Sequence, residues 1–185
     1  MKYATNGSLQ DILNKQCPQD FTNTSRQIIM IGVARSMMLF SKNKIFLGNL
    51  NPSKILLDEN YYPHLTDFYE SKLNNDHFEF CLYSDPNLLN NSNLNEKSDV
   101  YSFALIMYEI ITNTRLINQD QSFSKMIKKG QRPSIPENIK KSMNELIERN
   151  WSANPIERPS FEEIYYLLAY NKNYHLNDIN EKEVE

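Results

Sequence analysis

The fold is decided by Leu47-Gly48-Asn49-Leu50-Asn51-Pro52-Ser53-Lys54-Ile55-Leu56-Leu57 and by Asp67-Phe68-Tyr69, which begins ten residues after Leu57. Between these stretches lies Asp58-Glu59-Asn60, whose residue types favour a turn. Residues 54–57 and 62–66 flank this turn and are candidates for short strands. We therefore predict a β-hairpin here, with Asp67 directly after its second strand.

The rest of the chain is predicted to be mostly helical. A short helix is expected to end at Asn14, and Thr24 or Ser25 could cap a longer one that ends near Ser41. The helix expected over residues 96–112 is apolar around nearly its whole circumference, so it should be buried on most sides. Further helices are predicted over residues 122–129 and 137–151, and a last one after a Ser160 cap. In the helix that is expected to end near Ser41, residues at helical spacing are predicted to form one buried stripe: Ile28, Ile31, Ala34, Met38 and Ser41.

Two segments are predicted to be irregular. Residues 68–95 are polar and rich in Asn, so we expect a loop with at most one helical turn after Pro86. The polar, acidic residues 171–185 are expected to form a frayed tail.

Length and composition exclude several classes of function. A chain of 185 residues with 40% hydrophobic residues can form one well-packed core, so a single domain is expected. Its 20 Lys and Arg nearly balance 23 Asp and Glu, which gives no support to a nucleic-acid interface. The apolar runs are far shorter than the roughly 20 residues that span a bilayer. Cys17 and Cys81 match no metal-ligand spacing, which favours free thiols and a cytoplasmic protein.

Several segments, in the right order, resemble the C-lobe of protein kinases. Residues 47–57 are similar to His-Arg-Asp-Leu-Lys-Pro-x-Asn-Ile-Leu-Leu, and Asp67-Phe68-Tyr69 is similar to Asp-Phe-Gly. The other matching segments are Met1 to Leu9 (hinge and first helix), Gly32 to Met38 (helix before the catalytic loop), Tyr83-Ser84-Asp85-Pro86-Asn87 (Ala-Pro-Glu segment), Lys97 to Ala104 (start of the central helix) and Trp151 to Phe161. The sequence Asp-Val-Tyr-Ser-Phe at residues 99–103, and Trp151 upstream of Arg158, favour the tyrosine-kinase-like group of Ser/Thr kinases.

The resemblance implies a mainly α kinase C-lobe, a helical bundle with a short β-hairpin, over residues 1–170, followed by the tail at 171–185. It also implies that the principal catalytic residues have changed. Asn49 stands at the position of the catalytic base, where a neutral amide cannot accept a proton near neutral pH. Asn51 stands at the position of the catalytic-loop Lys. A catalytically impaired kinase, that is a pseudokinase, is therefore expected.

The nucleotide and metal positions are also altered. Lys54 replaces the Asn that binds the second magnesium, and a cation would repel the metal. Lys54 could be a solvated charge, or its ammonium could replace the metal by pairing with a nucleotide phosphate or with Asp67. Asp67 keeps the metal-binding carboxylate, although it could instead only bind the loop backbone. The floor under a nucleotide would be formed by Met1, Tyr3 and Leu56. Because the metal ligands have changed, no cofactor is expected beyond weak binding of ATP and Mg²⁺.

The residues that hold the family's scaffold are expected to remain. Asp99 matches the buried Asp that accepts hydrogen bonds from the catalytic-loop backbone, and Phe68 belongs to the apolar stack beside the central helix. Arg158 matches the Arg that pairs with the Glu of Ala-Pro-Glu, but Asn87 stands in place of that Glu. Arg158 therefore needs another acceptor.

The resemblance begins at the hinge, so the chain is expected to lack the N-lobe and its glycine-rich loop. The nucleotide floor would then be an exposed apolar patch, which favours a protein partner such as a kinase or an N-lobe supplied in trans. Three interpretations stay open: an inactive C-lobe that binds proteins, the C-terminal part of a longer Ser/Thr kinase that binds ATP and transfers phosphate to protein, or a fragment without function.

Overall fold

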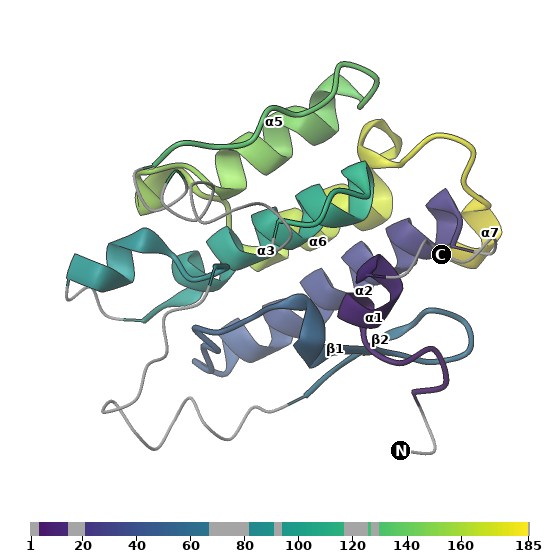
Figure 1. The fold of residues 1–185 in the computed structure, drawn as a ribbon, viewed down its shortest axis with the longest axis horizontal. Coiled ribbons are helices and arrows are strands. Elements are labelled where there is room, and N and C mark those ends of the chain that lie inside the picture. Colours follow the sequence, from purple (N-terminus) through teal and green to yellow (C-terminus); the bar gives the residue numbers. More distant parts are fainter. Residues whose placement is uncertain are drawn as a thin grey trace.

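The computed structural model describes residues 4–14, 21–66, 82–90, 94–116, 126 and 130–184 (Figure 1). It confirms the predicted mainly α fold with a two-stranded antiparallel sheet. The described helices are α1 (Leu9–Asn14), α2 (Asn23–Lys42), α3 (Glu96–Thr112), α5 (Lys141–Asn150), α6 (Phe161–Tyr170) and α7 (Glu181–Val184). Four short 3-10 helices are η1 (Pro52–Lys54), η2 (Pro86–Asn90), η3 (Pro155–Glu157) and η4 (Lys172–Tyr174), and the strands are β1 (Ile55–Leu57) and β2 (Pro63–Leu65).

Helix α3 lies in the middle of the bundle, between α5 on one side and α2 on the other (Figure 1). Every residue from Ser98 to Ile110 is buried, as the apolar sequence of this segment predicts. The helix begins where the side chain of Asn95 accepts a hydrogen bond from the backbone N–H of Lys97. It ends at Asn113, whose positive φ of 53° gives a left-handed cap.

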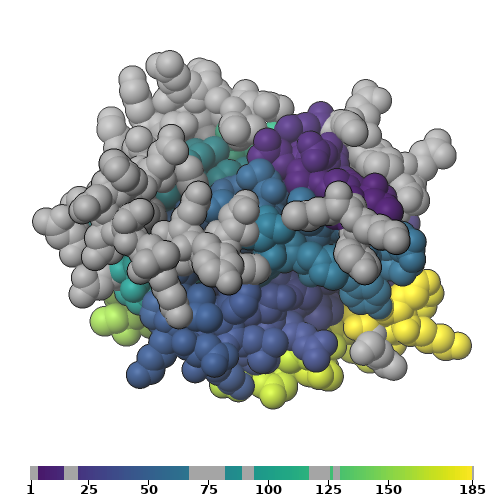
Figure 2. Space-filling model, turned by 90° about the horizontal axis from the view of Figure 1, so that it is seen from below, coloured from purple at the N-terminus to yellow at the C-terminus, as the bar shows by residue number. Residues whose placement is uncertain are grey.

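The predicted hairpin is present, and the start of the chain extends it. Leu56 of β1 pairs with His64 of β2 and, on the other side, forms a bridge with Ser8. Two backbone hydrogen bonds support this bridge, from Leu57 N–H to the carbonyl of Gly7 (2.8 Å) and from Asn6 N–H to the carbonyl of Leu57 (3.1 Å). Figure 2 shows α1, the hairpin and α2 forming one continuous surface on this face.

Two helices begin at other residues than predicted. Helix α2 is capped by Thr22, whose side chain accepts a hydrogen bond from Ser25 N–H, so the helix begins before the expected caps. Helix α5 begins at Lys141 rather than near residue 137, because residues 137–139 form a turn closed by a hydrogen bond from Ile139 N–H to the carbonyl of Pro136. The helix predicted over residues 122–129 lies outside the described residues, except for Met126, which is helical.

The C-terminal segment is packed, which differs from the frayed tail expected from its sequence. Buried Gln27 on α2 accepts a hydrogen bond from Leu176 N–H (3.1 Å), and Thr24 accepts one from Asn180 N–H (2.8 Å). Helix α7 lies beside the beginning of α2 (Figure 1). Polar side chains of α2 hold this segment through its backbone N–H groups, and Tyr174 and Leu176 pack against the core.

Gly32 lets helix α2 approach the hairpin. A Cβ atom at this position would lie 2.5 Å from Cγ and 2.6 Å from Cδ of Pro63 on β2. Gly→Ala inside a helix ordinarily stabilises by roughly 1 kcal/mol. Here the proline ring occupies the space that the new methyl group needs, so close packing decides the residue at this position.

We predict that Gly32→Ala lowers the free energy of unfolding by about 1–3 kcal/mol, because overpacking outweighs the gain in helix propensity. Urea denaturation measures the change. The double variant Gly32→Ala/Pro63→Ala, which removes Cγ and Cδ, should recover most of the loss relative to Pro63→Ala alone. If the effects of the two substitutions simply add, the proline ring is not the cause.

Candidate functional site

The loop that precedes β1 is held by a buried carboxylate on α3. Asp99 accepts hydrogen bonds from the backbone N–H groups of Leu47 (2.8 Å) and Gly48 (2.7 Å), one on each oxygen. Gly48 has a φ of 69°, in the left-handed region that suits glycine. The arrangement is the one that the kinase resemblance implies for Asp99.

Burial also changes the acidity of Asp99. The side chain is completely inaccessible to solvent, and this desolvation raises the pKa of Asp99 to about 7. The hydrogen bonds from Leu47 and Gly48 oppose the rise because they stabilise the charged form. The folded protein therefore keeps a proton on Asp99 over a pH range in which the unfolded chain releases it.

At the catalytic position, two neutral amides bind each other. The side-chain N–H of Asn51 donates to Oδ1 of Asn49 (3.1 Å) and to the backbone carbonyl of Asn49 (3.0 Å). The Oδ1 atom of Asn51 in turn accepts hydrogen bonds from the backbone N–H (3.0 Å) and the hydroxyl (2.6 Å) of Ser53. The acceptor oxygen of Asn49 is thus engaged inside the loop, and neither amide can act as a general base.

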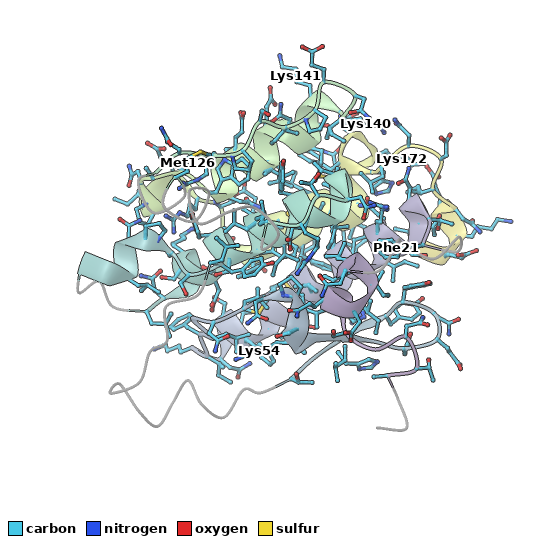
Figure 3. The ribbon with its side chains drawn as sticks, viewed as in Figure 1. Phe21, Lys54, Met126, Lys140, Lys141 and Lys172 are labelled. Carbon is cyan, nitrogen blue, oxygen red and sulfur yellow. The ribbon has the colours of Figure 1, made fainter. Side chains whose placement is uncertain are left out.

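Lys54 ends η1, and its backbone rather than its ammonium joins the hairpin. Its carbonyl accepts a hydrogen bond from Thr66 N–H (3.0 Å). Figure 3 shows the Lys54 side chain at the edge of the fold beside β1. Leu56, expected in an exposed patch, is half-buried. The other residues predicted for the nucleotide and metal site, Met1, Tyr3 and Asp67, lie outside the described residues, as does Phe68, which was predicted for the apolar stack.

The described residues do not supply the ligands that a kinase uses for its second magnesium. Lys54 is a cation at the ligand position, and hard divalent cations select oxygen ligands. Within the described part of the chain, no group of three or more His, Cys, Asp or Glu side chains could hold a metal ion.

The segment that matches Ala-Pro-Glu, residues 83–87, is held by a buried ion pair that sequence reasoning missed. The guanidinium of Arg158 donates from Nη1 to Oδ2 of Asp85 (2.5 Å) and from Nη2 to Oδ1 (3.2 Å). Asn87 instead donates its side-chain N–H to Oδ1 of Asp85 (3.0 Å) and to the carbonyl of Ala153 (3.2 Å). The acceptor that Arg158 needs is therefore Asp85, two residues before Asn87, and the carboxylate so near Asn87 was the available signal.

A second buried network holds the same segment against α3. The Tyr83 hydroxyl donates to Oε2 of Glu109 (2.8 Å), which also accepts from Nη1 of Arg115 (2.9 Å). Ser102 donates its hydroxyl to the backbone carbonyl of Tyr83 (2.8 Å). Burial raises the pKa values of Glu109 and Tyr83. An acidic residue inside an apolar helical run was the sequence signal for Glu109.

We predict that Asp85→Ala lowers the free energy of unfolding by about 3–5 kcal/mol, because it leaves the buried charge of Arg158 without a partner. Chemical denaturation measures this loss. The double variant Asp85→Ala/Asn87→Glu places a carboxylate at the position that the kinase family uses, and it should regain part of the stability. Asn87→Ala alone should cost less than Asp85→Ala, and an equal cost would contradict this assignment of the ion pair.

The Asp99 carboxyl predicts a specific pH dependence of stability. Its folded-state pKa of about 7 exceeds the ordinary value of about 3.9, so its contribution is present at low pH and is lost as the pH rises toward 7. Between pH 5 and pH 7, the free energy of unfolding of the parent minus that of Asp99→Asn should fall by about 1.4 kcal/mol per pH unit. Other titrating groups cancel in this difference, and the fixed cost of the amide adds only a constant that does not vary with pH. A difference that stays constant or rises with pH would refute the shift.

Comparison with known proteins agrees with this geometry. A family model described as protein tyrosine and serine/threonine kinase matches residues 1–168. Dual specificity protein kinase shkA of Dictyostelium discoideum is 34% identical over 143 residues, which cover 69% of this chain and 27% of that protein. Serine/threonine-protein kinase STY17 of Arabidopsis thaliana is 24% identical over 176 residues, which cover 90% of this chain and 31% of that protein.

A third relative has a name that refers to lost activity. Probable inactive serine/threonine-protein kinase roco10 of Dictyostelium discoideum is 42% identical over 78 residues, which cover 42% of this chain and 3% of that protein. The chain thus spans less than a third of the length of each of these three relatives. Because the family model covers most of its residues, and the loop held by Asp99 has the expected geometry, the chain belongs to the protein tyrosine and serine/threonine kinase family.

Proposed function

We propose that this kinase domain is catalytically impaired and acts as a pseudokinase, that is, as a protein-interaction or regulatory module. The observation that carries the proposal is the amide pair at the catalytic position, where Asn51 donates to the side-chain oxygen of Asn49. Phosphoryl transfer to a hydroxyl uses a carboxylate at this position to accept the proton. An amide held by its neighbour supplies no such base.

The pattern of retained and altered residues supports the proposal. Asp99 still holds the loop, and Arg158 still has a buried carboxylate partner. In contrast, Asn49 and Lys54 differ from the residues that accept the proton and bind magnesium. The positions that accept the proton and bind magnesium have changed, whereas the contacts that support the fold are intact. This pattern favours a domain that acts by binding other proteins.

A second candidate is the C-terminal part of a longer Ser/Thr kinase that binds ATP. The lengths of the three relatives favour it, because each is more than three times as long as its part that matches this chain. Asp67 at the metal-binding position supports the same candidate. In this reading the missing proton acceptor at Asn49 remains the obstacle to catalysis.

Partners and location follow from the first candidate. A kinase, or an N-lobe supplied in trans, would be a suitable protein partner, and the cytoplasm would be a suitable location. Among the residues that the structure describes, no helix has both the length and the apolar character needed to cross a bilayer.

We predict that the protein incorporates no phosphate from ATP into itself or into a generic basic protein substrate, in the presence of magnesium or manganese. Its melting temperature should rise by less than about 1 °C with millimolar ATP, and magnesium should not increase the change, because Lys54 repels the metal. Radiolabelled phosphotransfer and differential scanning fluorimetry measure these quantities.

Two variants provide the controls. Asn49→Asp restores only the proton acceptor, so it should remain inactive, and Asp67→Ala should not change the background signal. Robust phosphotransfer by the unmodified protein that Asp67→Ala abolishes would overturn the proposal. A magnesium-dependent rise in melting temperature without phosphotransfer would contradict the prediction on nucleotide binding alone.

A further inference from the structure

The C-terminal segment forms one wall of an open cavity. The cavity has a volume of about 580 Å³ and lies between the beginning of α5 and residues 172–181. Figure 3 shows the two lysines that line it, Lys140 before α5 and Lys172 in η4, at the same end of the molecule. The wall is fixed by backbone hydrogen bonds to α2, among them Leu176 N–H to Gln27 and Asn180 N–H to Thr24. The cavity is thus built by two parts of the fold that hydrogen bonds hold in place.

A buried histidine in this wall has no polar partner. His175 lines the cavity and is 9% exposed, and both of its ring nitrogens are buried without a hydrogen-bond partner. A neutral imidazole has one donor and one acceptor nitrogen, and leaving such groups buried and unpaired is costly. A ligand in the cavity would provide the missing partner if the ring turned to bring one nitrogen to the cavity surface.

The cavity is lined by two lysines and two carboxylates, so a monoanion is less disfavoured there than a dianion. Lys172 already pairs with Glu181 (2.6 Å), so these two charges largely cancel. Lys140 is half-buried and takes part in none of the ion pairs among the described residues. Asp178 also lines the cavity, and its carboxylate would repel a doubly charged anion such as phosphate. A monoanion can approach Lys140 and His175 with less repulsion.

The size of the cavity, and two aliphatic side chains within its mostly polar lining, favour a peptide over a free ion. Leu176 and Ile179 contribute half-buried aliphatic surface beside the charged groups. Cavities of about 300–1,000 Å³ accommodate ligands much larger than a single carboxylate ion. A short segment with an acidic side chain next to aliphatic ones would match the positive, polar and apolar parts of this lining.

We propose that this cavity binds an acidic peptide segment of a protein partner, whose carboxylate is held by Lys140 and His175. The proposal rests on the interaction function proposed above and names the surface and the chemistry of the partner. Lys140 would supply a charge-assisted hydrogen bond, and His175 would donate a second one after its ring turns toward the cavity.

The test is an NMR titration of the whole chain, whose three histidines give few ring signals. His175→Gln assigns the signal of His175. The probe is the blocked tripeptide acetyl-Leu-Glu-Leu-amide, and the matched control is acetyl-Leu-Gln-Leu-amide. We expect the acidic peptide to shift the His175 signal saturably and the amide peptide to bind about tenfold more weakly or not at all.

Neighbouring lysines provide matched variants. Lys140→Gln should weaken binding of the acidic peptide by about tenfold. Lys141→Gln should leave it unchanged, because Lys141 faces solvent and lies 3.7 Å from Glu145 on its own helix. Circular dichroism verifies that both variants are folded.

Three results would overturn the proposal: equal binding of the two peptides, an unchanged affinity in Lys140→Gln, or an equal loss in Lys141→Gln. If acetate shifts the His175 signal at the same concentrations as the peptide, the site binds a carboxylate ion alone, and this result would also refute the proposal. The titration needs no nucleotide. Phosphotransfer by the unmodified chain would therefore overturn the pseudokinase proposal without affecting this result.

Discussion

Burial of α3 from Ser98 to Ile110 constrains the rest of the structure, because a polar side chain on this helix is costly unless it finds a partner inside the protein. Asp99 finds it in the backbone of the loop before β1, and Ser102 and Glu109 find it in Tyr83. The buried helix α3 therefore also positions the two segments of the kinase-like site, which are the loop before β1 and the segment that contains Tyr83.

The residues at the catalytic and metal-binding positions are not part of this buried network. Asn51 donates a hydrogen bond to Asn49 within their own loop, and the backbone carbonyl of Lys54 accepts a hydrogen bond from Thr66 in the hairpin. Their identities can change without leaving an unpaired group in the core. Loss of catalytic residues is thus physically separable from loss of the fold.

Local sequence patterns predicted much of the fold. The buried helix α3, the hairpin and the Ser160 cap of α6 all follow from residues close together in the chain. The packed C-terminal segment could not be predicted in this way, because its contacts join residues far apart, such as Gln27 and Leu176, 149 positions apart. Asp99 was found through family resemblance, whereas the partners of Arg158 and Glu109 required the three-dimensional structure.

The ion pair of Arg158 explains why some departures from the kinase pattern are tolerated and others need compensation. Arg158 is 1% exposed, and a buried guanidinium cannot lose its proton to escape the cost of desolvation. Asn87 alone would leave that charge unpaired, and Asp85 supplies the carboxylate from two residues away. Asn49 needs no such compensation because a neutral amide in a surface loop carries no comparable cost. The fold therefore constrains charge at position 85, and only catalysis would constrain it at position 49.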